Sequence, residues 1–223
     1  MCFSAGASFG ASAVLSIIGT AAIMKARTIP QGLFASIPLI FSIQQLAEGM
    51  LWLCLRDPQL TGWQPFFTDL YLVFGLVVWP LWVPYTIRLL ETDQKRKKIL
   101  LLFLIAGFLA AAGAGYAMIF YSVDVIRADH HLHYEINFLP ATKEFVKLFT
   151  LFYLAATIVS SFISSVKRMK WLGIVFLFSY CVTVILYSST VVSIWCYFAS
   201  LLSVIVFWII SGLQEPGAGN NKH

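Results

Sequence analysis

Long apolar runs separated by short polar or basic segments extend through most of the chain. A helix needs about 20 predominantly apolar residues to cross a bilayer. Segments that reach or approach this length cover residues 5–24, 33–55, 66–90, 99–123, 145–166, 171–189 and 191–213. They are apolar all round, whereas the helices of soluble proteins alternate apolar and polar faces. The pattern predicts an all-α, polytopic membrane protein with seven transmembrane helices.

The boundary between the last two segments is the least marked. Only Ser188-Ser189-Thr190 separates them, and a continuous run of about forty residues is too long for one span. We therefore expect a helical hairpin there. Residues 1–213 are expected to form a single seven-helix domain, and residues 214–223 a short cytoplasmic tail.

Proline and small residues predict local features of the helices. Pro80 and Pro84 should kink or unwind the third segment, so that neighbouring helices must satisfy the freed carbonyl groups. Small residues at four-residue spacing let helices approach closely. They occur in the first and fourth segments, at Gly6, Gly10, Gly107, Ala111 and Gly115. We favour packing within one bundle, with a contact between copies in a homo-oligomer as the alternative.

Composition agrees with a membrane protein. The chain has 223 residues, of which 60% are hydrophobic and 11% are charged, whereas a soluble domain is about a quarter charged. The first lysine, Lys25, follows the first apolar segment instead of preceding it, so we expect a retained span and no cleaved signal peptide. The basic residues lie at predicted helix ends, so nucleic acid is not expected as a partner.

The distribution of Lys and Arg predicts an orientation, because cytoplasmic loops carry more of both. On one side the connections hold Lys25, Arg27, Arg88, Lys95, Arg96, Lys97, Lys98, Lys167, Arg168 and Lys170. The opposite side holds Arg56, Arg127, Lys143 and Lys147. The amino terminus should be extracytoplasmic and the carboxyl terminus cytoplasmic, in the inner (plasma) membrane.

Three polar residues interrupt the second segment: Gln44, Gln45 and Glu48. A charged residue at the centre of a bilayer costs about 2.5–3.5 kcal/mol on insertion scales, so such residues face the protein interior and have partners. On a helix Gln44 and Glu48 share a face, and Trp52 continues it toward the outer end. Glu48 would lie about 10 Å below the outer surface. It either binds a cation, a proton or a polar ligand, or ties helices together through Gln44 and Gln45.

Further polar residues are predicted on the same side of the membrane. Asp69 lies about one turn inside the third segment and belongs either to the site or to a helix cap. His130, His131 and His133 lie in the connection 124–144, which is long enough for a lid or a binding loop. Imidazoles suit zinc or copper, with a carboxylate completing the ligand set. Solvated loop histidines are the alternative.

Other chemistry is limited by what the sequence contains. Cys2 and Cys54 are both expected on the outer side, where a disulfide is conceivable, but the spacing does not require one. No GxSxG, HExxH or P-loop motif occurs. The predicted spans contain no histidine, which argues against haem ligation within the bundle.

Two motifs stand out in the first quarter of the chain. They are the opening Met-Cys-Phe-Ser-Ala of residues 1–5, followed by Ala7-Ser8-Phe9, and the Gln-Gln-x-x-Glu-Gly-x-x-Trp pattern of residues 44–52. Both motifs resemble those of an uncharacterised bacterial family of small multi-pass membrane proteins. Trp79-Pro80 and Pro84 are similar to the same pattern. The resemblance implies no activity.

These observations lead to three hypotheses of function. The first is a polar intramembrane pocket of Gln44, Gln45, Glu48, Trp52 and Asp69, open to the outer side, which binds a small ligand, a cation or a lipid head group for sensing or transport. The second is a metal-dependent membrane enzyme that uses the outer-loop histidines with Glu48 or Asp69. The third is a structural subunit of a membrane complex. The chain is too short for two transporter repeats of ordinary size.

Overall fold

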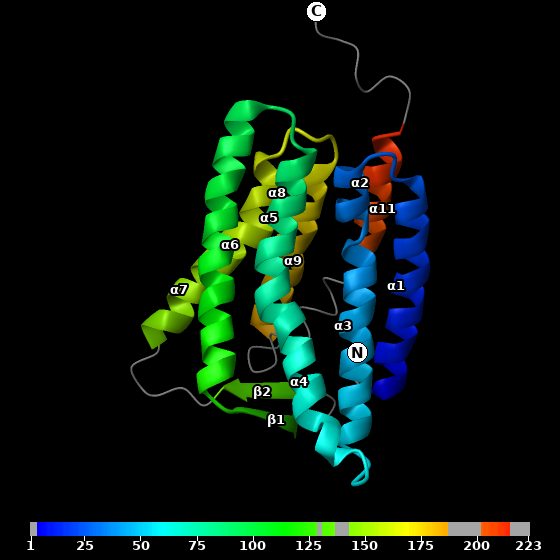
Figure 1. Ribbon diagram of the computed structural model, residues 1–223, viewed down its shortest axis with the longest axis vertical. Helices are drawn as coiled ribbons and strands as arrows, with labels where there is room; N and C mark the ends of the chain where they lie inside the picture. Colours follow the sequence, from blue (N-terminus) through cyan, green and yellow to red (C-terminus); the bar gives the residue numbers. More distant parts are fainter. Residues whose placement is uncertain (1–3, 129–130, 137–142, 187–201, 215–223) are drawn as a thin grey trace, which may run out of the picture.

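A computed structural model describes residues 4–128, 131–136, 143–186 and 202–214. Long helices lie side by side as a bundle, and a short β-hairpin crosses one end (Figure 1). Five helical stretches are long and apolar enough to cross a membrane: Ala5–Lys25, Ile29–Cys54, Thr61–Leu90, Gln94–Phe120 and Glu144–Ile163. The chain is therefore a helical, multi-pass membrane protein, as its apolar pattern predicts.

The last two predicted spans are only partly described. Helix α9 (Met169–Leu186) and helix α11 (Ser203–Gly212) are apolar but shorter than the five long stretches. The boundary predicted at 188–190 lies outside the described residues. A total of seven spans thus stays a prediction.

The first two spans form an antiparallel pair. Helix α1 (Ala5–Lys25) begins after Ser4, whose Oγ accepts a hydrogen bond from the backbone N–H of Ala7. The second span begins earlier than expected because Thr28 caps helix α2 (Ile29–Ala35) and Pro30 occupies its first turn. Helix α3 (Ile37–Cys54) follows directly after Ser36.

The third span contains the predicted irregularity. It consists of the 3₁₀ turn η1 (Thr61–Trp63), helix α4 (Gln64–Leu72), the π-helical segment η2 (Val73–Val78) and helix α5 (Trp79–Leu90). The segment η2 widens the turn just before Pro80, which has no backbone N–H to donate to the preceding turn and whose ring clashes with a carbonyl of that turn. The hydroxyl of Tyr153 donates to the freed carbonyl oxygen of Gly75 at 2.7 Å. A neighbouring helix thus satisfies the backbone, as expected.

That neighbour has an irregularity of its own. It comprises helix α7 (Lys143–Leu154), the π-helical segment η4 (Ala155–Val159) and helix α8 (Ser160–Ile163). Helix α6 (Gln94–Phe120) packs between the two irregular spans. At Gly107 a Cβ atom would lie 1.8 Å from the carbonyl oxygen of Pro80 and 3.2 Å from Ala156. Gly107 therefore serves packing within the bundle and is not available as a contact face for another subunit.

Within the described residues of one chain, the other predicted glycines make no close helix contact. A Cβ atom at Gly10 or at Gly115 would meet nothing within 4 Å, and at Gly6 it would meet only Ser4. The close contact of α1 with α3 is made elsewhere, at Gly19, where a Cβ atom would come within 2.7 Å of Leu39. Four-residue spacing is therefore a correct signal for helix packing, but it does not say which face of the helix packs.

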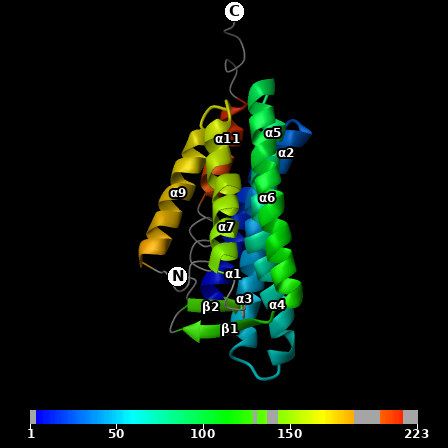
Figure 2. The same cartoon turned by 90° about the vertical axis from the view of Figure 1, so that its left-hand side faces the viewer.

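The connection 124–144 contains a β-hairpin that the sequence analysis did not predict. Strand β1 (Val123–Ala128) pairs antiparallel with strand β2 (His131–Ile136), with Val125 opposite Tyr134 and Arg127 opposite Leu132. The alternation of apolar and polar residues at 132–135 is typical of a strand with one buried face. Figure 2 shows the hairpin at the same end of the bundle from a second side.

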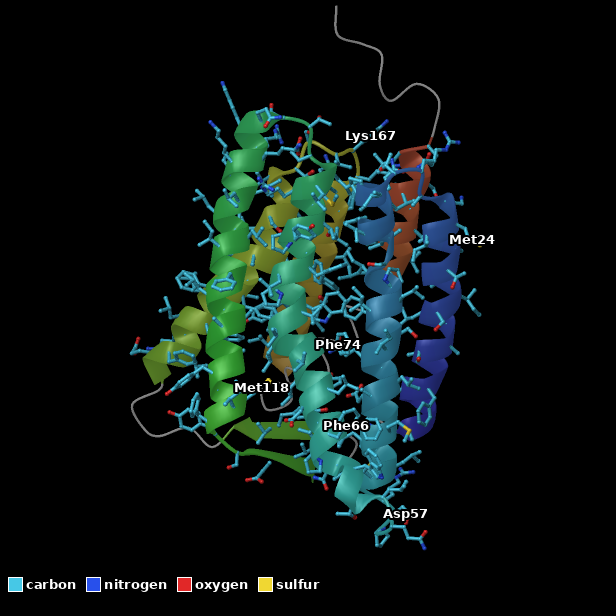
Figure 3. The ribbon with its side chains drawn as sticks, in the orientation of Figure 1. Met24, Asp57, Phe66, Phe74, Met118 and Lys167 are labelled. Atoms are coloured by element: carbon cyan, nitrogen blue, oxygen red, sulfur yellow. The ribbon has the colours of Figure 1, made fainter. Side chains whose placement is uncertain are left out.

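The two ends of the bundle differ in chemistry. We call the end that carries the β-hairpin and the turn at Asp57 the hairpin end, and the opposite end the basic end (Figure 3). Lys167 and Met24 lie toward the basic end (Figure 3). The basic end holds Arg88, which donates to the carbonyl of Lys97, and Arg96, which donates to the carbonyl of Ile163. Arginine side chains thus tie helix ends together there.

Glu91 joins two connections at the basic end. Its buried carboxylate accepts from the backbone N–H groups of Thr92 and Asp93, and from both the N–H and the hydroxyl of Ser165, at 2.5–3.0 Å. Burial raises the pKa of Glu91, but these hydrogen bonds outweigh it, so the pKa is lowered overall. The carboxylate therefore links the α5–α6 connection to the α8–α9 connection.

Candidate functional site

Helix α3 buries the polar residues that the sequence singled out. The side chains of Gln44, Gln45, Glu48 and Trp52 are fully buried. Most other residues of α3 are apolar. Burial follows from the cost of exposing amide and carboxyl groups to hydrocarbon. We call Gln44, Gln45 and Glu48 the α3 polar cluster.

Gln44 is held by an aromatic pair. The indole Nε1 of Trp79 donates to Gln44 Oε1 at 2.7 Å, and the Trp79 ring stacks on Phe41 with 3.8 Å between the ring centroids. An indole N–H can only donate, so it must face the amide oxygen and not the amide nitrogen. The orientation of the amide is therefore fixed, and Nε2 points away from Trp79. No described residue accepts a hydrogen bond from this nitrogen.

The side chain of Gln45 makes no hydrogen bond to any described residue. Its Oε1 and Nε2 are both buried, and neither has a partner among the described residues. By contrast, the hydroxyl of Ser42, about one turn away on α3, has hydrogen-bond partners. It donates to the carbonyl of Ser12 at 2.8 Å and lies 2.7 Å from the hydroxyl of Ser16. The fold thus satisfies the neighbouring hydroxyl fully while leaving a complete amide open.

The glutamines do not act as the partners of Glu48. The hydrogen bond of Gln44 goes to Trp79, and the remaining amide atoms of Gln44 and Gln45 bond to no described residue. The alternative in which Glu48 ties helices together through Gln44 and Gln45 is therefore wrong. The tie between helices is instead made by Trp79 of α5.

Two hydroxyl groups from other helices are buried near the same depth. Ser8 precedes Phe9, whose ring lies so close to Gly49 that a Cβ atom there would be 2.6 Å away. Thr68 lies three residues, or about one turn, before Tyr71, which clusters with Ala47. The hydroxyls of Ser8 and Thr68 are buried without a partner among the described residues. Helices α1 and α4 thus each add an unpaired hydroxyl at the level of Glu48.

The β-hairpin covers the cluster at its end of the bundle. Leu132 is fully buried in one apolar cluster with Leu51 and Trp52. Tyr134 stacks on Tyr71, with 5.2 Å between centroids and 10° between the ring planes. Strands β1 and β2 therefore pack over the ends of α3 and α4 at the hairpin end.

Asp69 does not join the cluster. It lies in the middle of α4 and is exposed, whereas Thr68 and Tyr71 beside it are buried. The capping alternative is also wrong, because α4 begins at Gln64, with Pro65 in its first turn, five residues before Asp69. The helix starts earlier than the apolar pattern indicates because proline favours the first turn.

The predicted metal ligands are only partly described. His131 and His133 lie in β2 on either side of Leu132, paired with Ala128 and Ile126, while His130 and the side chains of His131 and His133 lie outside the described residues. Within the described part of the chain no group of three His, Cys, Asp or Glu residues is arranged to hold a metal ion. The zinc or copper site stays a prediction. Cys54 is buried with a free thiol, and Cys2 lies outside the described residues.

Sequence reasoning missed the partners from other helices. Ser8, Thr68 and Trp79 reach the level of the cluster only through the packing of α1, α4 and α5 on α3. The one available signal was the four-residue spacing of Ser8, Ser12 and Ser16, which places hydroxyls along one face of α1.

The chemical consequence of this arrangement is a set of unsatisfied groups. Buried polar groups in native proteins almost always have a protein or water partner, and an unpaired one costs about 1–3 kcal/mol. These open groups therefore indicate a place for water or for a polar ligand: the amides of Gln44 and Gln45, and the hydroxyls of Ser8 and Thr68 about one helical turn nearer the hairpin end.

Comparison with known proteins adds a family but no activity. The model of one family, described as a family of unknown function (DUF6629), matches residues 1–220. No curated protein and no solved structure matches the chain.

Proposed function

The chain belongs to DUF6629, a family of unknown function, and we propose from its buried site that it binds a small polar ligand inside the membrane, for sensing or transport. The single observation that carries the proposal is the amide of Gln45, which is fully buried and unpaired among the described residues. An occupant that pairs with this amide supplies the missing hydrogen bonds.

The ligand types to be compared are a small molecule, a cation and a lipid head group. We place the site in the extracytoplasmic half of the inner (plasma) membrane of a bacterium, because the basic residues gather at the opposite end of the bundle.

Thermal unfolding of the full chain in detergent tests the proposal. The probes are chloride salts of sodium, calcium, magnesium and zinc, glycerol, acetamide and phosphoethanolamine. We expect at least one of them to raise the Tm of the wild type. Glu48→Gln should reduce that shift if the carboxylate contacts the ligand, and identical shifts in both proteins would argue against such a contact.

Gln45→Met separates an occupied site from an empty one. Methionine has a similar length but no hydrogen-bonding amide. If a ligand or ordered water satisfies Gln45, the substitution abolishes the ligand-dependent shift and lowers the Tm. If nothing ever occupies the site, removing the unpaired amide stabilises the fold, by about 1–3 kcal/mol. A raised Tm together with no response to any probe would refute ligand binding.

A metal-dependent enzyme is the second candidate, favoured by one observation. Strand β2 carries His131 and His133 beside Leu132, which packs against Trp52 at the hairpin end of the site. A metal held there would lower the pKa of a bound water near the membrane surface. Elemental analysis of the purified chain tests this, since stoichiometric zinc or copper is expected and its lack would exclude the enzyme.

A further inference from the structure

The open groups of the α3 polar cluster indicate what kind of ligand fits. Gln44 offers only Nε2, because its oxygen is bonded to Trp79. Gln45 offers both Nε2 and Oε1. Each amide nitrogen carries two N–H groups, so open donors outnumber the single open amide oxygen.

This balance is unfavourable for a metal cation. Calcium takes six or more oxygen ligands and magnesium about six. The bond from Trp79 removes the oxygen of Gln44 from any such set and turns an amide N–H₂ group inward. Amide nitrogen atoms do not ligate these ions, and their N–H dipoles repel a positive charge. A cation would find the carboxylate of Glu48 and one open amide oxygen in the cluster, well short of six oxygen ligands.

A free anion fits equally poorly. Among the buried side chains that the structure describes, the charged ones are Glu48 and Glu91, with no buried Lys, Arg or His. Transfer of an unpaired anion into a low-dielectric interior carries a large penalty, and Glu48 provides no compensating positive charge.

We propose that the site takes a small uncharged molecule that both accepts and donates hydrogen bonds, the chemistry shared by simple amides, urea and polyols. The amide nitrogens of Gln44 and Gln45 donate to its oxygen, and Gln45 Oε1 accepts from its N–H or O–H. The hydroxyls of Ser8 and Thr68 lie near the level of Glu48, about one helical turn from these amides, and can serve either role. This inference rests on the proposed ligand-binding function.

Equilibrium dialysis of the full chain in detergent tests the inference. Radiolabelled acetamide, urea and glycerol are compared with radiolabelled sodium and calcium ions. We expect saturable binding of at least one uncharged probe and none of either ion. Gln45→Met should weaken the binding about tenfold or more, since two or more hydrogen bonds are lost. Gln94→Met, at an exposed glutamine of the basic end, should leave it unchanged.

Each outcome decides between the ligand classes. Saturable sodium or calcium binding that Gln45→Met removes would overturn the uncharged class, yet leave ligand binding at this site in place. Saturable binding of an uncharged probe that Gln45→Met leaves intact would overturn the assignment to this cluster, as would a lack of saturable binding by every probe. Should Gln45→Met not fold, the comparison of uncharged and ionic probes on the wild type still decides. The proposed function itself fails only in the thermal experiment above.

Discussion

At the scale of single residues, Trp79 determines which hydrogen-bonding groups of the α3 polar cluster are open to a ligand. Its indole N–H fixes the amide of Gln44, and its ring is itself fixed by stacking on Phe41. Because the indole N–H can only donate, the amide oxygen of Gln44 must face it, and the amide cannot take the flipped orientation. A residue on a different helix thereby sets the hydrogen-bonding character of the site.

Trp79→Phe should therefore destabilise the fold. The ring stacking survives in part, but the buried oxygen of Gln44 loses its donor, at a cost of about 1–3 kcal/mol. Trp82→Phe is the matched control, because the Nε1 of Trp82 has no partner among the described residues. The measurement is thermal unfolding in detergent, and equal losses in the two variants would contradict the role given to Trp79.

Glu91 predicts a dependence of stability on pH at the basic end. Its folded-state pKa lies below the usual value, so the carboxylate contributes stability above the unfolded pKa, which is lost as pH falls through the folded pKa. Glu91→Gln should thus be less stable than the wild type at pH 7, and the difference should shrink below about pH 4.5, the ordinary pKa of a glutamate.

The measurement is the Tm of the wild type and of Glu91→Gln, taken from pH 7 to below about pH 4.5. Glu144→Gln is the control, because Glu144 is an exposed glutamate whose salt bridge, to Lys147, lies within α7. A difference between the wild type and Glu91→Gln that stays constant with pH would contradict a titrating carboxylate.

At the scale of elements, irregular helix segments and one glycine determine how the spans fit together. The hydroxyl of Tyr153, at the end of α7, donates to the carbonyl oxygen of Gly75 in η2, and η4 packs against α5. Helix α6 approaches both irregular spans because Gly107 has no side chain against the carbonyl of Pro80. Pro80 thus accounts for the irregularity at η2, and a glycine on the neighbouring helix permits the close approach.

Gly107→Ala should separate α6 from α5. The new Cβ atom would lie 1.8 Å from the backbone oxygen of Pro80, which cannot move away as a flexible side chain would. We expect a loss of about 1–3 kcal/mol or more. Gly115→Ala, on the same helix with nothing within 4 Å of the new atom, should cause no loss. Chemical or thermal unfolding in detergent measures both, and a tolerated Gly107→Ala would refute the close contact.

At the scale of the whole molecule, the two ends of the bundle predict its orientation in the membrane. Asp57 lies at the hairpin end and Lys167 toward the basic end (Figure 3). Since basic residues favour the cytoplasm, the basic end should face inward and the buried site should be nearer the outer surface.

Single cysteines at these positions report the orientation. In intact cells an impermeant maleimide should label Asp57→Cys, whereas Lys167→Cys should be labelled only after permeabilisation. Both side chains are exposed, and the unsubstituted chain gives the background from native cysteines. The reverse pattern of labelling would show that the orientation is inverted.

Particular residues show which features of the fold and the site can be predicted from the sequence. The apolar runs predict a multi-pass helical protein, because only helices with satisfied backbones tolerate hydrocarbon. The same cost predicts that Gln44, Gln45 and Glu48 face inward. The β-hairpin was missed because its alternation is short and lies within a polar connection. Asp69 was misplaced because an apolar pattern does not locate the first turn of α4.

The sequence by itself determined the helical spans and the inward-facing polar residues. Both follow from the cost of transfer from water into lipid, which acts on each segment independently. The tertiary structure alone decided the contacts of the site, because these depend on which helix faces which. Three features are relations between helices: the bond from Trp79 to Gln44, the amide of Gln45 that no described residue pairs, and the hydroxyls of Ser8 and Thr68 near the level of Glu48. No single segment contains the information for them, because side-chain hydrogen bonding between helices depends on relative rotation and depth.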